Sequence, residues 1–581
     1  MKYLFVAIRN HDDVAPIGLA YVAAALRQSG RHISSFNFGN HKDPIKVLLQ
    51  KIEYNDIDVL CLGALSEEFS YLRDTIATVR KNCPSVKIIV GGGIITAEPE
   101  FMIQHLDMDF GCVGYGEETI CEFAECLETH GDFSKIKGLI YKDETGQFII
   151  NPRRPEPENL DNIPFPALDL FGLNSSSRLL PILGSRSCTH NCTFCFHSSG
   201  YRYKNRSLDN IFLEIEYWKE KFDITIVNFF DELFGYKKEH IYEFCRRIKI
   251  LGLKFIISLR VDIVSEELIK VLSESGCVYI GYGIESVNQQ VLDSMRKQIT
   301  VEQIEYALKI TKQYNIKSTG NILFGDRVET YEMATETLLW WLKNIHFGLN
   351  IMFINAYPGT VMYKHGVKTG RIQDKLKFLE DKCRKVNLSA MSDAEFSRLH
   401  EQVKLMMGLV MKTANKTRFE IGEDGVVLVC GDCPHCGTTI SVDYEQVDLT
   451  FDLFDRQSCT KCGSCIKLFP KERDNLLDKS YFNEFNYKGK KIAVWGLTPK
   501  AKFRLASNRN MRDAVVVIVD RDYQRFENKF LGFEVQSPKV LSKIEFDVLY
   551  IGSDVSRLGI FSMAKEIIGS EIYHKEIMLI P

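Results

Sequence analysis

The sequence lacks a hydrophobic run close to the roughly 20 residues that a membrane-spanning helix needs. The apolar stretch at residues 3–8 is too short for a signal-peptide core. An excess of one charge is also lacking, because 73 basic and 76 acidic residues leave a formal net charge of −3. Proteins that grip nucleic acid usually carry a basic surplus. These absences predict a globular protein of the cytoplasm, with neither a membrane nor nucleic acid as partner.

Cysteine departs from this ordinary composition. The chain has 17 cysteines, and nine of them fall into three tight clusters, at 188–195, 430–436 and 459–465. Disulfide frameworks belong to exported chains, whereas clustered cysteines in a reducing compartment are typical of metal sites. The cysteines therefore predict metal ligation in a cytoplasmic protein.

Residues 1–140 read as alternating strands and helices. This pattern is typical of a doubly wound, mostly parallel sheet. Ligands of such sheets bind beyond the carboxyl ends of the strands. We therefore expect the lining of a ligand site at residues 9–18, 64–67, 91–96 and 114–119.

The remaining chain divides into five parts. Residues 141–175 are proline-rich and predict a linker, and six strand–helix units at 176–365 predict a partial (βα)6 barrel of the TIM type. Residues 366–420 predict a helical connection, and 421–475 a small cysteine-rich module. Residues 476–581 have the pattern of a second, Rossmann-like α/β domain, although the glycine fingerprint is reduced to Gly496. We expect this last domain to serve substrate recognition or docking.

The barrel segment contains Cys188, Cys192 and Cys195 in the spacing C-x3-C-x2-C, directly after a predicted strand. Three thiolates on one loop cannot complete a tetrahedral zinc site by themselves. They can hold three corners of a 4Fe–4S cluster and leave one iron open to a substrate or cofactor. A zinc site completed by His190 or His197 is the alternative.

This segment resembles the radical S-adenosylmethionine (radical SAM) enzymes, whose cysteine loop has an aromatic residue before its last cysteine, as Phe194 is here. The resemblance continues along the barrel through FFDELF (229–234), GYGIES (281–286), GNILFGDRVET (320–330) and YPGT (357–360). It implies that the open iron binds S-adenosylmethionine and that an electron from the cluster cleaves it to a 5′-deoxyadenosyl radical. The cofactor-binding residues that it implies are Phe194, Glu285, Ser286, Gly320, Ile322 and Gly325. Arg206 and Arg260 could support carboxylates or form structural salt bridges.

The N-terminal part resembles the cobalamin-binding domain that precedes many radical SAM barrels, through PIGLAYVAAALR, VGGG and GYGEET. The residues that this resemblance implies at the corrin are Ser66, Gly91, Gly92, Gly93, Thr96, Gly116 and Glu117. The D-x-H-x-x-G loop that supplies a histidine to cobalt in other cobalamin proteins is missing, because His11 lies seven positions before Gly18. We therefore expect no protein histidine on cobalt. A domain that keeps the fold without cobalamin is the alternative.

The cysteine-rich module repeats a C-x2-C-G pattern, in CPHCG and again in CTKCG. This repetition predicts a zinc ribbon with the ligands Cys433, Cys436, Cys459 and Cys462. An auxiliary iron–sulfur cluster is the alternative, because Cys430 and Cys465 bring the number of thiolates to six.

The resemblances together predict a cobalamin-dependent radical SAM enzyme that methylates an unactivated carbon of a small-molecule or saccharide-type substrate. Its electron donor would be a reductase such as flavodoxin or ferredoxin. One alternative is cyclisation, oxidation or rearrangement without methyl transfer, and another is a non-catalytic iron–sulfur carrier or sensor. A methylthiotransferase of tRNA shares the barrel and normally has three further cysteines in its N-terminal domain and a basic RNA-binding tail. The near-neutral charge and the tail of this chain fit that function poorly.

Overall fold

The computed structural model describes most of residues 1–410 and parts of the remainder. Up to residue 410 it leaves out 9–15, 42, 174–176, 198–199, 201, 223, 236 and 385. Beyond that it describes 412–421, 427–443, 456–459, 461, 465–467, 489–497, 501, 505, 509–521, 523–525, 529–551, 563–564, 566–568 and 576–579. The chain forms two compact units, one of residues 1–173 and 177–407 and the other of 174–176 and 408–581.

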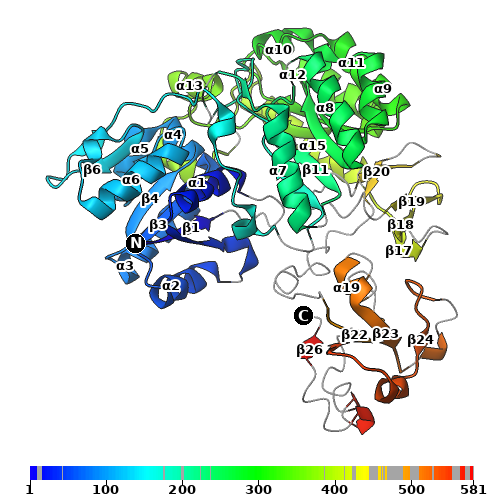
Figure 1. Cartoon of the computed structure of the whole chain (residues 1–581). Coiled ribbons are helices and arrows are strands. Elements are labelled where there is room, and N and C mark those ends of the chain that lie inside the picture. Colours follow the sequence, from blue (N-terminus) through cyan, green and yellow to red (C-terminus); the bar gives the residue numbers. More distant parts are fainter. Residues whose placement is uncertain are drawn as a thin grey trace. The chain divides into compact units, whose positions relative to one another are not determined.

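The first unit begins with a seven-stranded sheet in the order β2-β1-β3-β4-β5-β6-β7 (Figure 1). Its strands are β1 (Lys2–Ala7), β2 (His32–Asn37), β3 (Val59–Gly63), β4 (Lys87–Gly91), β5 (Phe110–Cys112), β6 (Leu139–Lys142) and β7 (Phe148–Ile150). Strands β1 to β5 are parallel, which confirms the predicted doubly wound sheet, while β6 and β7 are antiparallel. The β6–β7 hairpin brings part of the stretch predicted as a linker into this sheet.

The helices of this part are α1 (Ile17–Gln28), α2 (Pro44–Tyr54), α3 (Phe69–Asn82), α4 (Gly93–Ala97), α5 (Pro99–His105) and α6 (Glu117–Thr129). Strands β2 and β3 flank β1 on opposite sides, so the strand order reverses between β1 and β3. In open α/β sheets, ligands bind outside the carboxyl ends of the strands at such a reversal.

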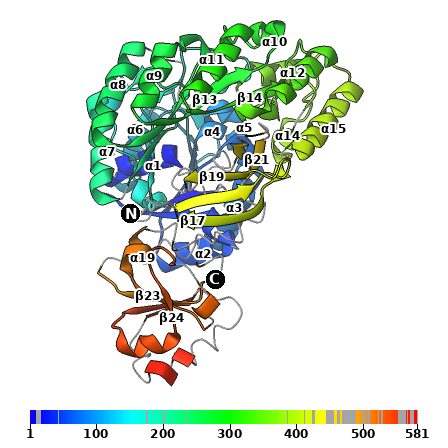
Figure 2. The same cartoon turned by 90° about the vertical axis from the view of Figure 1, so that its right-hand side faces the viewer.

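Six parallel strands then form a second sheet in sequence order, as the predicted partial barrel requires. They are β8 (Leu179–Ile182), β11 (Ile226–Phe229), β12 (Lys254–Leu259), β13 (Cys277–Glu285), β14 (Lys317–Phe324) and β15 (Asn350–Phe353). The accompanying helices are α7 (Leu208–Lys221), α8 (Lys238–Leu251), α9 (Glu266–Glu274), α10 (Gln289–Ser294), α11 (Val301–Gln313) and α12 (Tyr331–Lys343). Figure 2 shows α8, α9, α11 and α12 as a layer outside the strands.

Side-chain caps fix where several of these helices begin. The hydroxyl groups of Ser207, Ser265, Thr300 and Thr330 accept hydrogen bonds from backbone N–H groups in the first turns of α7, α9, α11 and α12. Each cap satisfies an N–H group that has no partner within the helix. The caps therefore set the ends of the loops that lead from β8, β12, β13 and β14 into these four helices.

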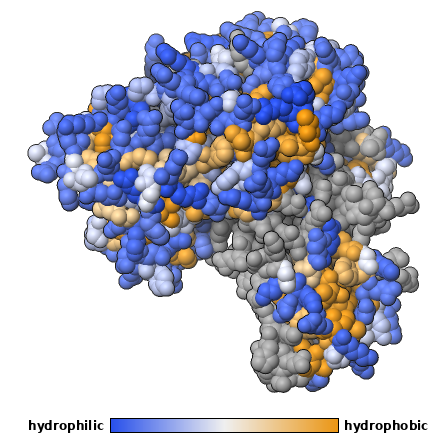
Figure 3. All heavy atoms as spheres, in the orientation of Figure 1, coloured by the Kyte–Doolittle hydropathy of each residue, from blue (hydrophilic) through white to orange (hydrophobic). Residues whose placement is uncertain are grey.

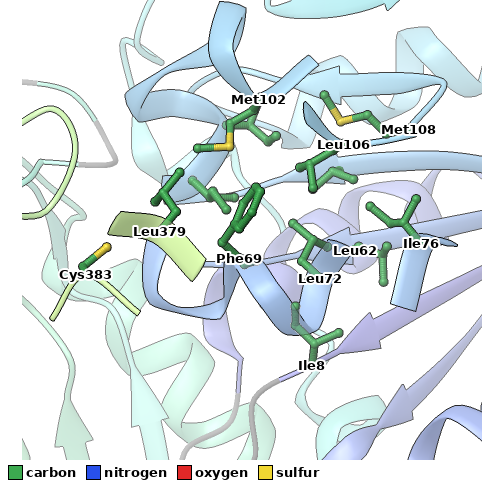
Figure 4. Close-up of a cluster of buried hydrophobic side chains, with 14 of the residues drawn as sticks. Ile8, Leu62, Phe69, Leu72, Ile76, Met102, Leu106, Met108, Leu379 and Cys383 are labelled. Carbon is green, nitrogen blue, oxygen red and sulfur yellow. The ribbon is translucent and has the colours of Figure 1, made fainter. Parts of the chain in front are cut away.

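The chain after the barrel packs against the N-terminal part. Helices α13 (Val361–Lys368) and α14 (Lys375–Glu380) follow β15. Leu379 and Cys383 are buried in the same apolar cluster as Phe69 and Met102 (Figure 4). A continuous hydrophobic core therefore joins the two α/β parts of the first unit. The loops of one part consequently have a defined position relative to the loops of the other.

The second unit contains two small sheets and one larger sheet. The small sheets have the orders β17-β18-β19 and β16-β21-β20, and the larger one is parallel with the order β24-β23-β22-β25-β26. The bounds are β16 (Lys412–Thr413), β17 (Asn415–Ile421), β18 (Val427–Asp432), β19 (Thr439–Asp443), β20 (Arg456–Ser458), β21 (Cys465–Lys467), β22 (Ile492–Trp495), β23 (Val515–Val519), β24 (Val535–Gln536), β25 (Val548–Ile551) and β26 (Glu576–Leu579). The parallel order agrees with the α/β pattern read from the sequence.

Hydrophilic residues cover most of the visible surface of the first unit (Figure 3). Within the described part of the chain, the helices are all too short or too polar to cross a membrane.

Candidate active site

The cysteine loop of the barrel is anchored on two sides. It follows β9 (Ser185–Arg186), which pairs with β10 (Lys204–Asn205). In the middle of the loop, the Thr193 N–H donates to the Met295 carbonyl at 3.1 Å, and the Thr193 carbonyl accepts from the Met362 N–H at 3.0 Å. These bonds hold the segment between Cys192 and Cys195 in place before any cofactor binds.

The thiols of this loop lie close enough to influence one another. Burial raises the pKa of Cys195 to about 12, and the negative charges of Glu232, Cys192 and Cys188 add to that rise. Burial also raises the pKa of Cys192, against the nearby positive charge of Lys297. The thiols of Cys192 and Cys195 therefore hold their protons until a metal displaces them. Three sulfur donors on one loop suit a cubane cluster with one open iron.

A different donor group lies beside the last cysteine. The donor atoms of Cys195, His197 and Glu232 lie within 4.8 Å of one another. His197 Nδ1 and Glu232 Oε2 are 2.8 Å apart. This group includes only one cysteine of the loop, so it leaves the spacing of the other two unexplained.

Glu285, which is predicted to hydrogen-bond S-adenosylmethionine, ends strand β13 with a φ of 67°. Its Oε1 accepts a 2.7 Å hydrogen bond from Lys297 Nζ. Burial alone disfavours the Lys297 ammonium, but the charges of Glu285 and Cys192 outweigh it and the pKa of Lys297 is raised. The pair presents one negative and one positive group beside the cysteine loop.

Lys297 was missed by the sequence analysis. It follows α10 in a segment whose flanking residues, Arg296 and Gln298, both have positive φ. Arg260 Nη2 donates to the Lys297 carbonyl at 3.0 Å and Arg260 Nε to Asp262 Oδ1 at 3.0 Å. Arg260 thus anchors the backbone of the lysine segment. Neither periodicity nor spacing marks Lys297, because its burial depends on tertiary packing.

The other residues predicted at S-adenosylmethionine differ in their surroundings. The Phe194 ring centroid lies 6.0 Å from Lys297 Nζ, and buried Ile322 pairs in register with Glu285. Ser286 Oγ accepts from the Asn288 N–H at 3.1 Å. The structure thus brings Phe194, Glu285 and Ile322 together with Lys297, while Ser286 closes a local turn.

Two predicted glycines have packing roles of their own. A Cβ atom on Gly320 would lie 2.6 Å from Ile284 Cδ1 and 2.8 Å from the Tyr282 carbonyl oxygen. Gly325 has a φ of 108°, and its N–H donates to Glu329 Oε2 at 2.6 Å. Close packing of β14 against β13 therefore requires Gly320, and the turn after β14 requires Gly325.

The acidic motif FFDELF (229–234) at the end of β11 and the side chain of Arg206 stabilise the backbone around the site. Asp231 accepts hydrogen bonds from the Gly184 N–H at 2.7 Å and from Ser185 Oγ at 2.8 Å, which ties the end of β11 to the segment before the cysteine loop. Arg206 donates to Glu214 Oε2 at 2.5 Å, and both side chains are buried. Arg206 therefore forms a structural ion pair.

The carboxyl ends of the two sheets in the first unit face each other. Arg186 of the barrel donates to Glu117 Oε1 at 2.5 Å, and its guanidinium lies 5.0 Å from the Tyr21 ring centroid and 5.1 Å from that of Tyr115. Arg186 stands two residues before Cys188. The cysteine loop is therefore connected through a buried ion pair to the start of α6 in the N-terminal part.

A second connection is apolar. Phe196 follows the last cysteine of the loop, and its ring lies 3.4 Å from where a Cβ on Gly93 would be and 2.6 Å from where one on Gly359 would be. In the same region Tyr357 donates from its hydroxyl to Glu67 Oε2 at 3.1 Å. Gly93 thus makes room for a barrel side chain.

The residues predicted to contact the corrin line the carboxyl edge of the N-terminal sheet. Most of them pack against, or hydrogen-bond to, other residues of the chain. Gly92 has a φ of 92°, and a Cβ there would lie 2.6 Å from the Ala64 carbonyl oxygen. Thr96 Oγ1 accepts from the Gly114 N–H at 2.9 Å, and Gly116 precedes α6 where a Cβ would lie 3.0 Å from Val22. Gly91 ends β4 and buried Ser66 opens the turn after β3. His11 lies outside the described residues.

Comparisons with known proteins agree with this arrangement. The B12 binding domain family matches residues 3–124, the Radical SAM superfamily matches residues 182–340, and the family described as C2185-like, N-terminal matches residues 488–578. The first match covers strands β1 to β5, and the second contains the cysteine loop, Glu285 and Lys297. The chain therefore contains a domain of the Radical SAM superfamily, preceded by a B12 binding domain.

Individual proteins are similar to this chain in sequence or in fold. An uncharacterized methyltransferase of Pyrococcus horikoshii is 28% identical over 363 residues, which span 61% of this chain and 78% of the relative. An anaerobic magnesium-protoporphyrin IX monomethyl ester cyclase of Rubrivivax gelatinosus is 23% identical over 363 residues, 58% of this chain and 65% of the relative. The solved structure of TsrM, a radical S-adenosylmethionine methyltransferase from Kitasatospora setae, gives a TM-score of 0.55 at 18% identity and covers 64% of this chain and 77% of that chain. This structural likeness shows the fold.

Proposed function

We propose that this protein is a cobalamin-dependent radical SAM methyltransferase. The observation that carries the proposal is that the carboxyl ends of two sheets face each other. One is the barrel sheet with the cysteine loop, and the other is the sheet of the B12-binding domain with its loops. The Arg186–Glu117 pair and the contact of Phe196 with Gly93 fix this apposition. A substrate held between the edges would be accessible to both cofactors.

When bound, the 4Fe–4S cluster with S-adenosylmethionine supplies hydrogen-atom abstraction, and cobalamin supplies a methyl group. Cys188, Cys192 and Cys195 would hold the cluster. Glu285 would accept hydrogen bonds from the amino group of S-adenosylmethionine, and Lys297 would balance the negative charge of its carboxylate. The 2.7 Å contact between Lys297 Nζ and Glu285 Oε1 supports this division, because it places a cation and a hydrogen-bond acceptor side by side at the end of β13.

The substrate class proposed is a small molecule or a saccharide, with an unactivated carbon as the methyl acceptor. The electron donor proposed is flavodoxin or ferredoxin. The reducing cytoplasm expected from the cysteine usage suits such an oxygen-sensitive cluster.

A second candidate function is cyclisation or oxidation without methyl transfer. The similarity to the cyclase of Rubrivivax gelatinosus supports it, since the match spans 58% of the present chain. The mass of the product separates the two candidates, because methylation adds one CH2 unit and cyclisation does not.

The proposal is tested on the full chain after anaerobic purification and cluster reconstitution. We expect 5′-deoxyadenosine from S-adenosylmethionine under dithionite, and a corrinoid retained after gel filtration. An iron-loaded protein that forms no 5′-deoxyadenosine would instead be an electron carrier or sensor. A protein that forms it but retains no corrinoid would favour the non-methylating function.

A further inference from the structure

Two hairpins of the second unit carry the same cysteine pattern at the same register. Strands β18 and β19 pair Asp432 with Thr439, so the six residues CPHCGT join them. Strands β20 and β21 pair Ser458 with Cys465, so the six residues CTKCGS join them. Each connection therefore starts with C-x2-C-G directly after a paired strand end.

The first of these loops is a tight turn. The Cys433 N–H donates to the Thr438 carbonyl at 2.8 Å, and the Gly437 N–H donates to the Cys433 carbonyl at 2.9 Å. Gly437 has a φ of 75°, a conformation that favours glycine. This backbone holds Cys433 and Cys436 on one side of the turn.

The sulfur atoms of the two hairpins meet. Those of Cys433, Cys436 and Cys459 lie within 4.8 Å of one another, and those of Cys436 and Cys459 are 3.5 Å apart. Four thiolates around one zinc ion at about 2.3 Å have sulfur atoms about 3.8 Å apart. Thiolates on separate irons of a cluster lie farther apart, because each binds its own iron. Cys188, Cys192 and Cys195, all within the described chain, do not form such a close group.

The other two cysteines of the module occupy strands. Cys430 lies within β18 opposite Ser441, and its sulfur is 3.0 Å from Ser441 Oγ. Cys465 begins β21 opposite Ser458. Among the described cysteines of the module, three therefore lie in the hairpin loops and two in the strands.

We propose that the two hairpins bind one structural zinc ion, with Cys433, Cys436 and Cys459 as the ligands that the structure brings together. Cys462 lies outside the described residues, and it is the fourth ligand predicted from the sequence pattern alone, since its position in CTKCG corresponds to that of Cys436 in CPHCG. The ion would join two three-stranded sheets that are each too small for a core of their own. Since β21 also pairs with β16, it would fix the chain just after residue 410. This inference does not depend on the reaction proposed for the first unit.

The test is metal analysis of the full chain expressed without added zinc and purified anaerobically. We expect one zinc per chain, which Cys433→Ser and Cys459→Ser each remove. Cys430→Ser is the matched control, because it alters a buried thiol of the same hairpin, and we expect it to keep its zinc. A variant with Cys188, Cys192 and Cys195 all changed to Ala should lose its iron and retain zinc.

A spectroscopic measurement avoids reliance on variants that misfold. Exchange of cobalt(II) into the wild-type chain should give the visible and thiolate charge-transfer bands of a tetrahedral four-sulfur site. Iron that persists in the triple barrel variant and disappears with Cys459→Ser would overturn the proposal in favour of an auxiliary cluster. Zinc that is absent, or present at wild-type level in Cys433→Ser and Cys459→Ser, would also overturn it.

Discussion

Lys297 Nζ lies 2.7 Å from Glu285 Oε1 in the barrel, and each residue is only 7% exposed. Two charges in such a place are costly to bury unless each has a partner. The pair lies beside Cys192, whose pKa responds to both residues. This relationship links the strand β13 motif to a lysine 12 residues later, outside any motif read from the sequence.

The first prediction concerns this pair. A charge-assisted hydrogen bond is worth about 1.5–3 kcal/mol. We therefore expect Glu285→Gln to weaken S-adenosylmethionine binding by roughly ten- to a hundredfold with unchanged iron content. Equilibrium dialysis on the reconstituted protein measures the affinity.

A double variant separates the effect of the pair on protein stability from its effect on S-adenosylmethionine binding. Removing one member of a buried ion pair costs about 3–5 kcal/mol, so Lys297→Met alone should lower the unfolding midpoint. Glu285→Gln with Lys297→Met should recover most of that stability while the affinity stays low. Wild-type affinity in a well-folded double variant would show that the pair only supports the fold.

The second prediction concerns the cysteine loop. We expect Cys192→Ala to lose the barrel cluster and all formation of 5′-deoxyadenosine, because two thiolates cannot hold a cubane with a defined open iron. The matched control is Cys83→Ala at the end of α3, which should keep both. Iron analysis and mass spectrometry check the result, and residual cleavage by Cys192→Ala would contradict the cluster assignment.

The sequence predicted the parallel sheets and the cysteine motifs well, because alternation and spacing are local properties of the chain. It could not predict the Arg186–Glu117 pair, whose members are 69 residues apart, or the burial of Lys297. For Gly320 and Gly93, which the sequence assigns to cofactors, the structure adds the close neighbours Ile284 and Phe196, which the sequence could not predict. A glycine in a motif shows that space is needed there, and only tertiary structure shows what fills that space.

The third prediction concerns the ion pair between the facing edges. Arg186→Met would leave Glu117 buried without its cation, so we expect a loss of about 3–5 kcal/mol in the stability of this contact. Hydrogen exchange should rise at residues 113–119 and in the cysteine loop. The further change Glu117→Gln should reverse much of this rise. Arg246→Met, in an exposed pair with Glu243, is the control without effect on either segment. Unchanged exchange in Arg186→Met would mean that the shared apolar core alone holds the edges together.

The fourth prediction concerns the corrin, and the structure decides which glycine can test it. Gly92→Val would damage the domain itself, since a side chain there would collide with the Ala64 carbonyl at a φ of 92°. Gly18, in the first turn of α1, is exposed and has no atom within 4 Å of where a Cβ would lie. The side chain of neighbouring Leu19 lies against Gly63 at the end of β3, so this turn borders the expected crevice. We therefore expect Gly18→Phe to fold normally, keep its barrel iron and lose retained corrinoid. Gln28→Phe, at the exposed opposite end of α1, is the matched control and should retain it. Corrinoid absorbance after gel filtration is the measurement, and equal retention by both variants would place the ligand away from the β1–β3 edge.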